Sequence, residues 1–208
     1  MRRIYDGFGP IHDPLLRAFL PLVDGHSEEQ ARAAILEATR LPRGRGRVLD
    51  ACCGSGAELL GLARRFPEAQ LFGVDLSVTM VDLGRRHLSE AGVEAWLGLA
   101  DVHSLPFPDA SFELVVSVGA INNFADKRRA LAEMVRVLKP GGMLVLVDEE
   151  LDGSRRHSLF HRAMFRLLTF YDLDPRNPSH LLEGVEQVRV EQITRYYYLL
   201  QCRRSGAP

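Results

Sequence analysis

The sequence has few cysteines, no excess of charge and no long apolar run. Its three cysteines do not form a disulfide framework, and two of them, Cys52 and Cys53, are adjacent. No apolar stretch reaches the ~20 residues that span a bilayer, and no apolar signal core follows Arg2 and Arg3. The formal net charge of −1 gives no overall attraction to nucleic acid. We therefore expect a cytoplasmic protein without a membrane span and without a nucleic-acid partner.

The composition is that of an ordinary globular domain, with 46% hydrophobic and 25% charged residues in a chain of 208. Between about 45 and 150, strand-like and helix-like segments alternate, which indicates an α/β fold with a parallel sheet and helices on both faces. We expect one domain over 1–208. It divides into an N-terminal arm and helices over 1–40 that form a lid, a cofactor-binding core over 45–150, and a lid helix with a terminal strand pair over 151–208.

Hydrophobic periodicity and turn residues predict the elements around this core. The best-defined one is a helix that Asp126 caps at its N-terminus and that Pro140 and Gly141 stop. The other expected elements are an irregular arm over 1–13, helices over 14–23, 28–39 and 155–171, a buried strand over 143–147, and strands over 185–191 and 194–201.

The most informative segment runs from position 48 to 59 and reads as a buried strand, a glycine turn and the start of a helix. Gly54 and Gly56 let the backbone turn tightly and lie close to a ligand. The helix that follows directs its free N–H groups at the same turn. Asp75 ends the next apolar run. A carboxylate at that position can accept hydrogen bonds from the hydroxyls of a ribose. Together these features predict a site for a nucleoside-containing cofactor.

Two residues decide which cofactor is favoured. Leu59 stands where a dinucleotide fingerprint has its third glycine, so that fingerprint is broken. Asp50 lies at the strand end just before the glycines, where its carboxylate would repel a pyrophosphate. The same carboxylate would attract an ammonium or a sulfonium. S-adenosylmethionine carries both cations and no phosphate.

An acidic residue and glycines spaced like Asp50, Gly54 and Gly56, directly after a strand, resemble the first motif of the class I S-adenosylmethionine-dependent methyltransferases. Further segments resemble the same family in the same order and extend the likeness over about 45–150. They are Gly73–Ser77, Ala100–Val102 with Leu105–Phe107, Phe112–Ser117 and Arg136–Gly142. Within the family the chain is most similar to the small-molecule branch that includes the ubiquinone and menaquinone biosynthesis C-methyltransferases.

The resemblance implies a Rossmann-like methyltransferase fold. Its seven-stranded, mostly parallel sheet has the order 3-2-1-4-5-7-6, with strand seven antiparallel and helices on both faces. The implied cofactor is S-adenosyl-L-methionine. Asp75 is assigned to the ribose, Asp101 to the adenine amino group and Asp50 to the methionine end. The full set of expected cofactor residues is Asp50, Gly54, Gly56, Asp75, Leu76, Met80, Asp101, Val102, Ser117, Gly119 and Asn122, with Asn123 as the alternative to the last.

Methyl transfer from a sulfonium is a direct displacement, which needs alignment of the reacting atoms and exclusion of water. The reaction therefore needs neither a catalytic triad nor a metal. A weak acceptor nucleophile also needs a base. Candidate catalytic residues are His103, two residues beyond Asp101, and Tyr5 and His12 in the N-terminal arm.

The other histidines, cysteines and acidic residues can be interpreted either structurally or chemically. His157 and His161 stand at i, i+4 but lack the neighbouring carboxylate of a metal motif, so no metal site is expected. Cys52 and Cys53 lack an adjacent base and are interpreted as small side chains that fill space beside the cofactor. The acidic residues at 148–150 could carry acid–base chemistry or form a solvated turn.

The favoured function is transfer of a methyl group to a small, apolar or aromatic acceptor by a monomer or homodimer. Acceptor contacts are expected from the N-terminal arm and from the segment after strand five. These contribute Tyr5, Phe8 and His12, and Phe160, Met164, Phe165, Phe170 and Tyr171. Two alternatives stay open: an NAD(P)-dependent oxidoreductase on a similar sheet, and a non-catalytic S-adenosylmethionine-binding regulatory protein.

Overall fold

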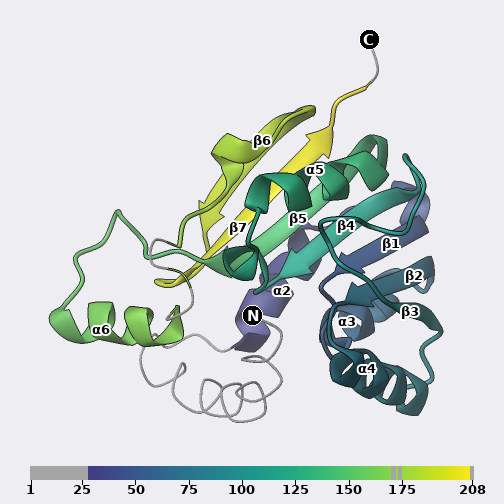
Figure 1. The fold of residues 1–208 in the computed structure, drawn as a ribbon, viewed down its shortest axis with the longest axis horizontal. Coiled ribbons are helices and arrows are strands. Elements are labelled where there is room, and N and C mark those ends of the chain that lie inside the picture. The colour runs from purple at the N-terminus through teal and green to yellow at the C-terminus, as the bar shows by residue number, and fades with distance from the viewer. Residues whose placement is uncertain (1–27, 170–171, 173–174, 207–208) are drawn as a thin grey trace.

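The computed structural model describes residues 28–169, 172 and 175–206. Seven strands form one sheet in the order β3-β2-β1-β4-β5-β7-β6 (Figure 1). The pairs among the first five strands are parallel, whereas β7 is antiparallel to both β5 and β6. The predicted fold is therefore confirmed, including its antiparallel seventh strand.

The elements follow one another as the alternating pattern predicts. The strands are β1 (Arg45–Ala51), β2 (Glu68–Asp75), β3 (Ala95–Leu99), β4 (Phe112–Val118), β5 (Leu138–Glu149), β6 (Val185–Gln192) and β7 (Tyr197–Arg204). The α-helices are α2 (Glu28–Ala38), α3 (Ala57–Arg65), α4 (Val78–Glu90), α5 (Lys127–Val137) and α6 (Leu159–Leu168). Single 3₁₀ turns are η1 (Pro42–Gly44), η2 (Ile121–Asn123) and η3 (Ser179–Leu181).

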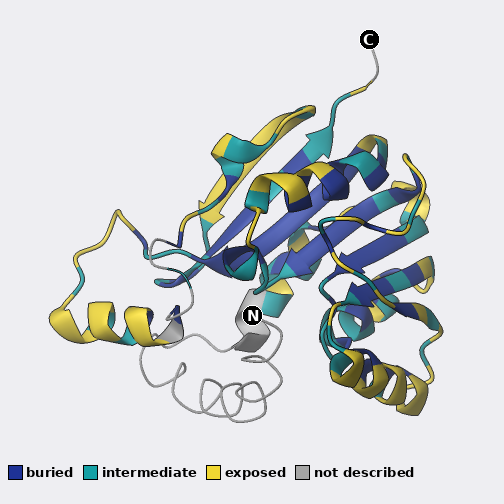
Figure 2. Ribbon diagram, viewed as in Figure 1, coloured by how far each residue is buried: buried dark blue, intermediate teal, exposed yellow. Residues whose placement is uncertain are grey.

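Alternate residues of the central strands pack into two core layers, one on each face of the sheet. In β1, Val48 joins the layer that contains Leu59 of α3, and Leu49 joins the layer that contains Leu131 of α5. Both strand residues are fully buried, because helices cover both faces of the sheet (Figure 2). This double coverage is why the central strands are continuous apolar runs in the sequence.

The N-terminal part of the described chain belongs to the body of the domain. Helix α2 places Ile35, which is 1% exposed, in the same core layer as α3 and α4. The expected arm over 1–13 and helix over 14–23 lie outside the described residues. The lid over 1–40 therefore stays a prediction.

Helix α6 is shorter than the predicted span of 155–171. It begins after Ser158, whose hydroxyl accepts a hydrogen bond from the backbone N–H of His161, while the His161 ring bonds back to the Ser158 N–H. This reciprocal cap fixes the first turn at Leu159. The residues before it form an irregular connection from β5.

The terminal strand pair is present, but its second strand begins three residues later than the predicted 194–201. The hydroxyl of Thr194 accepts hydrogen bonds from the backbone N–H groups of Tyr196 and Tyr197. These local bonds hold a turn where the apolar pattern alone predicts a strand. The strand β7 consequently runs over Tyr197–Arg204.

Candidate cofactor site and acceptor edge

The turn after β1 has the backbone conformation that its glycines predict. Gly54 has a φ of 49° and Gly56 a φ of 80°, both in the left-handed region. Cys52 also has a positive φ, 74°, and both it and Cys53 donate a backbone hydrogen bond of 2.9 Å to the carbonyl of Val74. A Cβ built on Gly54 would meet no atom within 4 Å. The turn is thus open on the side that a ligand would approach.

Asp75 ties the end of β2 to this turn. Its Oδ2 accepts a hydrogen bond of 2.9 Å from the backbone N–H of Gly54, and its Oδ1 accepts one of 2.9 Å from Ser77. The hydroxyl of Ser77 caps α4 by accepting from the N–H of Met80. Each carboxylate oxygen keeps a further lone pair for a ligand. The sequence predicts the ligand role of Asp75, whereas its role in holding the glycine turn emerges only in the structure.

Asp50 is a buried carboxylate at the end of β1, 1% exposed. Its Oδ2 has no hydrogen-bond partner in the described part of the chain. Burial raises the pKa of Asp50 well above its ordinary value, and the charges of Glu58 and Asp75 raise it further. The nearby cation is Arg32 of α2, which lowers this pKa but forms its 2.8 Å ion pair with Glu58. A buried, unpaired carboxylate is costly, so this position favours a cationic ligand group.

The loop after β3 carries Asp101, Val102 and His103. Asp101 Oδ1 accepts a 2.9 Å bond from the His103 backbone N–H and lies 2.6 Å from His103 Nδ1. These two hydrogen bonds lower the pKa of Asp101. Nε2 of His103 is buried and has no partner among the described residues, and the ring lies 5.7 Å from that of Phe124. Val102 is buried in the core layer that contains Leu131.

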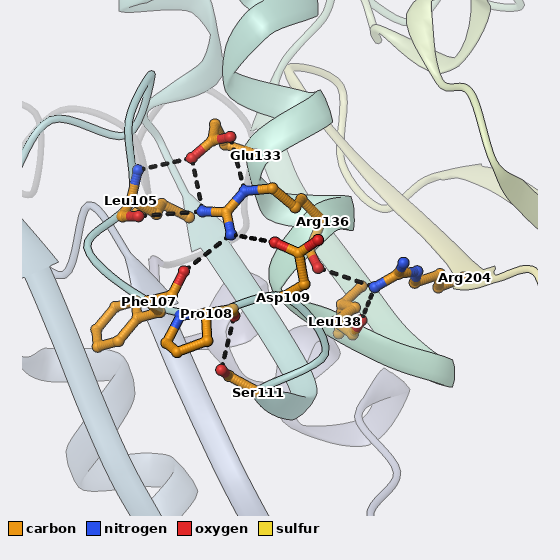
Figure 3. Close-up of polar contacts among 9 residues, drawn as sticks. All are labelled: Leu105, Phe107, Pro108, Asp109, Ser111, Glu133, Arg136, Leu138 and Arg204. Carbon is orange, nitrogen blue, oxygen red and sulfur yellow. Dashed lines mark hydrogen bonds and ion pairs between the residues drawn. The ribbon is translucent and has the colours of Figure 1, made fainter.

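Arg136 of α5 fixes this loop through bonds that the sequence does not predict (Figure 3). Its guanidinium donates to the carbonyls of Leu105 (3.1 Å) and Phe107 (2.8 Å) and to Asp109 Oδ1 (2.7 Å). It also donates two 2.8 Å bonds to Glu133, whose carboxylate accepts the N–H of Leu105 at 2.8 Å. Arg136 thus connects α5 to the chain just beyond the expected adenine contacts. Arginine presents such a fork of donors, and lysine does not.

Asn122 lies in η2 and is 3% exposed. Its side-chain N–H₂ donates to Asp148 Oδ1 and to the Glu149 carbonyl, both at 2.8 Å, and its Oδ1 accepts from Lys127 at 3.2 Å. The amide therefore joins the loop after β4 to the end of β5. Whether Asn122 or Asn123 contacts a cofactor stays a prediction.

Polar atoms are buried at the end of the sheet where β4 and β5 finish and the antiparallel β7 begins. Ser117 Oγ and the Tyr198 hydroxyl are both fully buried and have no partner within the described residues. Burial raises the pKa of Tyr198, and the charges of Asp148 and Glu149 add to the effect. Burial and Glu149 likewise raise the pKa of Asp148. Gly119, with a φ of 61°, leaves this edge open, since a Cβ there would meet nothing within 4 Å.

The remaining predicted residues divide into those near the turn and those outside the described chain. Leu76 is 48% exposed directly after β2, and Met80 is half-buried in the first turn of α4. Tyr5 and His12 lie outside the described residues, as do Phe170 and Tyr171. Across the described ranges no group of three or more His, Cys, Asp or Glu side chains could hold a metal ion.

His157 and His161 each contact the chain close to their own position. His157 Nε2 lies 2.6 Å from the carbonyl of Asp152, and His161 is part of the α6 cap. Each ring thus has a nitrogen engaged in a local contact, and the expectation that this pair binds no metal stays a prediction.

Comparison with known proteins assigns the segment that contains these residues to a family. Residues 48–142, which hold the glycine turn and all three carboxylates, match the methyltransferase domain family. The chain contains a class I methyltransferase domain. Over 140 residues it is 36% identical to the demethylmenaquinone methyltransferase of Thermus thermophilus, covering 67% of this chain and 62% of that protein.

A second relative is the ubiquinone/menaquinone biosynthesis C-methyltransferase UbiE of Geobacter sulfurreducens. It is 38% identical over 131 residues, which cover 62% of this chain and 48% of the relative. The chain therefore spans less than two thirds of the length of these curated relatives.

Solved structures share the fold of this methyltransferase domain at low sequence identity. A geranyl diphosphate C-methyltransferase from Streptomyces coelicolor has a TM-score of 0.72 and 15% identity, over 86% of this chain and 76% of that one. The resemblance to the methyltransferase family is confirmed, and these matches give no support to the oxidoreductase or regulatory alternatives. In the described part of the chain no helix has both the length and the apolar content to cross a bilayer.

Proposed function

We propose that this chain is an S-adenosylmethionine-dependent methyltransferase that acts on a small, apolar or aromatic acceptor. The observation that carries the proposal is the buried, unpartnered carboxylate of Asp50 beside the open glycine turn. A phosphate there would add a second negative charge, whereas an ammonium or sulfonium would neutralise the first. When bound, S-adenosylmethionine supplies a methyl group on a sulfonium, which a nucleophile displaces directly.

Three carboxylates at neighbouring strand ends would divide the cofactor between them. Asp50 would accept from the methionine end, and Asp75 from the ribose hydroxyls through the lone pairs that Gly54 and Ser77 leave free. Asp101 would accept from the adenine amino group through the oxygen that His103 does not engage. The other proposed cofactor contacts are Gly54, Gly56, Leu76, Met80, Val102, Ser117, Gly119 and Asn122.

His103 is the proposed proton acceptor. Its Nδ1 is held 2.6 Å from Asp101, which leaves Nε2 as the free ring nitrogen, buried and without a partner in the described chain. This is the arrangement in which a carboxylate orients an imidazole as a base. Tyr5 and His12 are proposed to close over the site from the N-terminal arm.

The acceptor is proposed to be a ring compound that carries a hydroxyl. One relative is named a demethylmenaquinone methyltransferase, which supports a quinol-like ring as the acceptor class. A polar group on such an acceptor would approach along the open backbone at Gly119. We further propose a cytoplasmic monomer or homodimer that does not bind nucleic acid.

Calorimetry with S-adenosylmethionine, S-adenosylhomocysteine and NAD tests the cofactor. We expect the first two to bind and NAD not to bind; tighter binding of NAD would overturn the proposal. Methyl transfer is then measured with a panel of quinol and phenol acceptors. Tight cofactor binding without transfer to any acceptor would instead favour a non-catalytic protein.

Deletion of residues 1–12 tests the lid. The shortened chain should keep its unfolding temperature and lose most transfer activity, since the deleted segment contains Tyr5 and His12. Full turnover by the truncated protein would contradict the lid role of both residues.

A further inference from the structure

Helix α6 carries the most exposed large apolar side chains of the described residues. Leu159 is 86% exposed, Leu167 65% and Phe160 59%. Leu159, Ala163 and Leu167 follow at four-residue spacing, with Phe160 next to them, so they form one apolar stripe along the helix. A contiguous exposed stripe of this kind marks a surface that contacts something apolar.

The opposite side of α6 is already occupied. Phe165 is 6% exposed and stacks on Tyr196 with ring centroids 5.8 Å apart, and Met164 and Leu151 pack around this pair. The stack attaches α6 beside the sheet. The outer surface of α6 is exposed along most of the length of the helix (Figure 2). The stripe is therefore surplus to the packing that holds the helix.

A basic row borders the stripe. The segment 153–169 contains four arginines and no acidic residue, although the whole chain has a net charge of −1. Arg162 and Arg166 are exposed and lie one turn apart along the edge of the stripe, and Arg155 and Arg156 are exposed just before the helix. Arg155 is ion-paired with Asp152 at 2.7 Å, whereas the described residues offer Arg156 and Arg162 no acidic partner.

We propose that α6 is a docking helix for the surface of an anionic lipid membrane. Large apolar side chains beside a row of arginines fit the boundary between acyl chains and acidic headgroups, where the helix lies in the plane of the membrane. The arginine row and the absence of acidic residues over 153–169 favour an anionic lipid surface over a neutral apolar partner. This inference goes beyond the proposed methyl transfer and does not depend on it.

Docking in this orientation has a consequence for the site. Helix α6 follows β5, whose end carries Asp148 and Glu149 beside Asn122. A membrane held by α6 would therefore lie on the side of the domain where strand β5 ends. An apolar acceptor dissolved in lipid could then reach the site without crossing bulk water.

Co-sedimentation of the full chain with vesicles tests the proposal, without cofactor or acceptor. We expect binding to vesicles that contain phosphatidylglycerol, weaker binding at high salt, and little binding to pure phosphatidylcholine. The substitutions Leu159→Ser, Phe160→Ser and Leu167→Ser together should lower partitioning by about a hundredfold or more. The pair Arg156→Gln and Arg162→Gln should lower it by about thirtyfold.

A matched control removes exposed apolar side chains elsewhere. Val188 and Val190 of β6 are 43% and 42% exposed, and their replacement by serine should leave vesicle binding unchanged. The arginine variant changes only exposed side chains, so it keeps the test decisive if the serine variant fails to fold. Absence of vesicle binding by the wild-type chain would overturn the proposal.

Size-exclusion chromatography with light scattering tests whether a second copy of the chain, and not a membrane, covers the stripe. A wild-type dimer that the serine variant converts to a monomer, without any vesicle binding, would assign the stripe to self-association and refute the lipid surface. Because no step of this test uses methyl transfer, its failure would leave the proposed function untouched, and a failure of the proposed function would leave the docking result standing.

Discussion

Replacement of Asp50 by asparagine should change stability and cofactor affinity in opposite directions. The ligand-free protein holds this carboxylate buried, with one oxygen unpartnered in the described chain and with Glu58 and Asp75 nearby. An unsatisfied buried group costs ~1–3 kcal/mol, and more when it is charged. Asparagine has nearly the same size and removes the charge. We expect a gain of about 1 kcal/mol, which is a rise of about 2–4 °C in melting temperature for a domain of this size.

The pH dependence gives the sign of this effect. Because the folded protein raises the pKa of Asp50, its contribution to stability is fully present below the unfolded pKa and is lost as the pH rises through the folded pKa. The gain from Asp50→Asn should therefore be largest at neutral and alkaline pH. It should vanish in acid, where the wild-type carboxyl group is also neutral. Thermal unfolding of both proteins between about pH 3 and pH 8, followed by circular dichroism, measures it, since the unfolded pKa of aspartate is about 3.9.

Cofactor affinity should fall in the same variant. A charged hydrogen bond is worth ~1.5–3 kcal/mol, so the dissociation constant for S-adenosylmethionine should rise by about 10- to 150-fold. An equal loss for S-adenosylhomocysteine would assign the contact to the ammonium, since that ligand lacks the sulfonium. Near or below the pKa of Asp50, calorimetry in buffers of different ionisation enthalpy should also detect proton release by the wild type alone.

A matched control is Glu113→Gln. Glu113 is paired with Lys139 and accepts a 2.6 Å bond from the backbone N–H of Arg47, which together lower its pKa despite the opposing effect of burial. Its loss should destabilise the fold and leave cofactor binding unchanged. An Asp50→Asn variant that binds both ligands as tightly as the wild type would refute the assignment of Asp50 to the methionine end.

Three further substitutions test the other parts of the site. Asp75→Ala should weaken cofactor binding by about 10- to 100-fold and, because Gly54 and Ser77 lose their acceptor, should also lower the melting temperature; an unchanged dissociation constant in calorimetry would remove Asp75 from the ribose site. Arg136→Met should cost about 3–5 kcal/mol in urea unfolding because it leaves the buried carboxylate of Glu133 without its cation, and should weaken cofactor binding from outside the site. Since the folded protein lowers the pKa of Glu133, this contribution is present at neutral pH and is lost as the pH falls below the ordinary glutamate range. His103→Asn should lower the single-turnover rate of methyl transfer by about 100- to 10,000-fold with little change in cofactor affinity, and a rate within a factor of two of wild type would exclude His103 as the base.

Local signals in the sequence determined the order of the strands, turns and helices along the chain. The strand, glycine turn and helix at 48–59 are consecutive in the chain, and only glycine readily adopts the positive φ that Gly54 and Gly56 require. The caps follow the same logic, since Asp126 accepts from the N–H of Arg129 three residues later. Asp75 could be placed at a strand end because the apolar run before it is continuous. The first residues of α6 and β7 differ from the predicted ones, because the side chains of Ser158 and Thr194 bond to the backbone nearby.

Tertiary structure alone decided which of these residues are buried, paired or free. Asp50 and Arg32 are separated in sequence, and only the packing of α2 against the sheet shows that the nearby cation is engaged by Glu58. Arg136 reaches a loop that lies about thirty residues earlier. The exposure of Leu159 likewise depends on how the other segments pack around α6. Burial and pairing depend on contacts between distant segments, which no local pattern encodes.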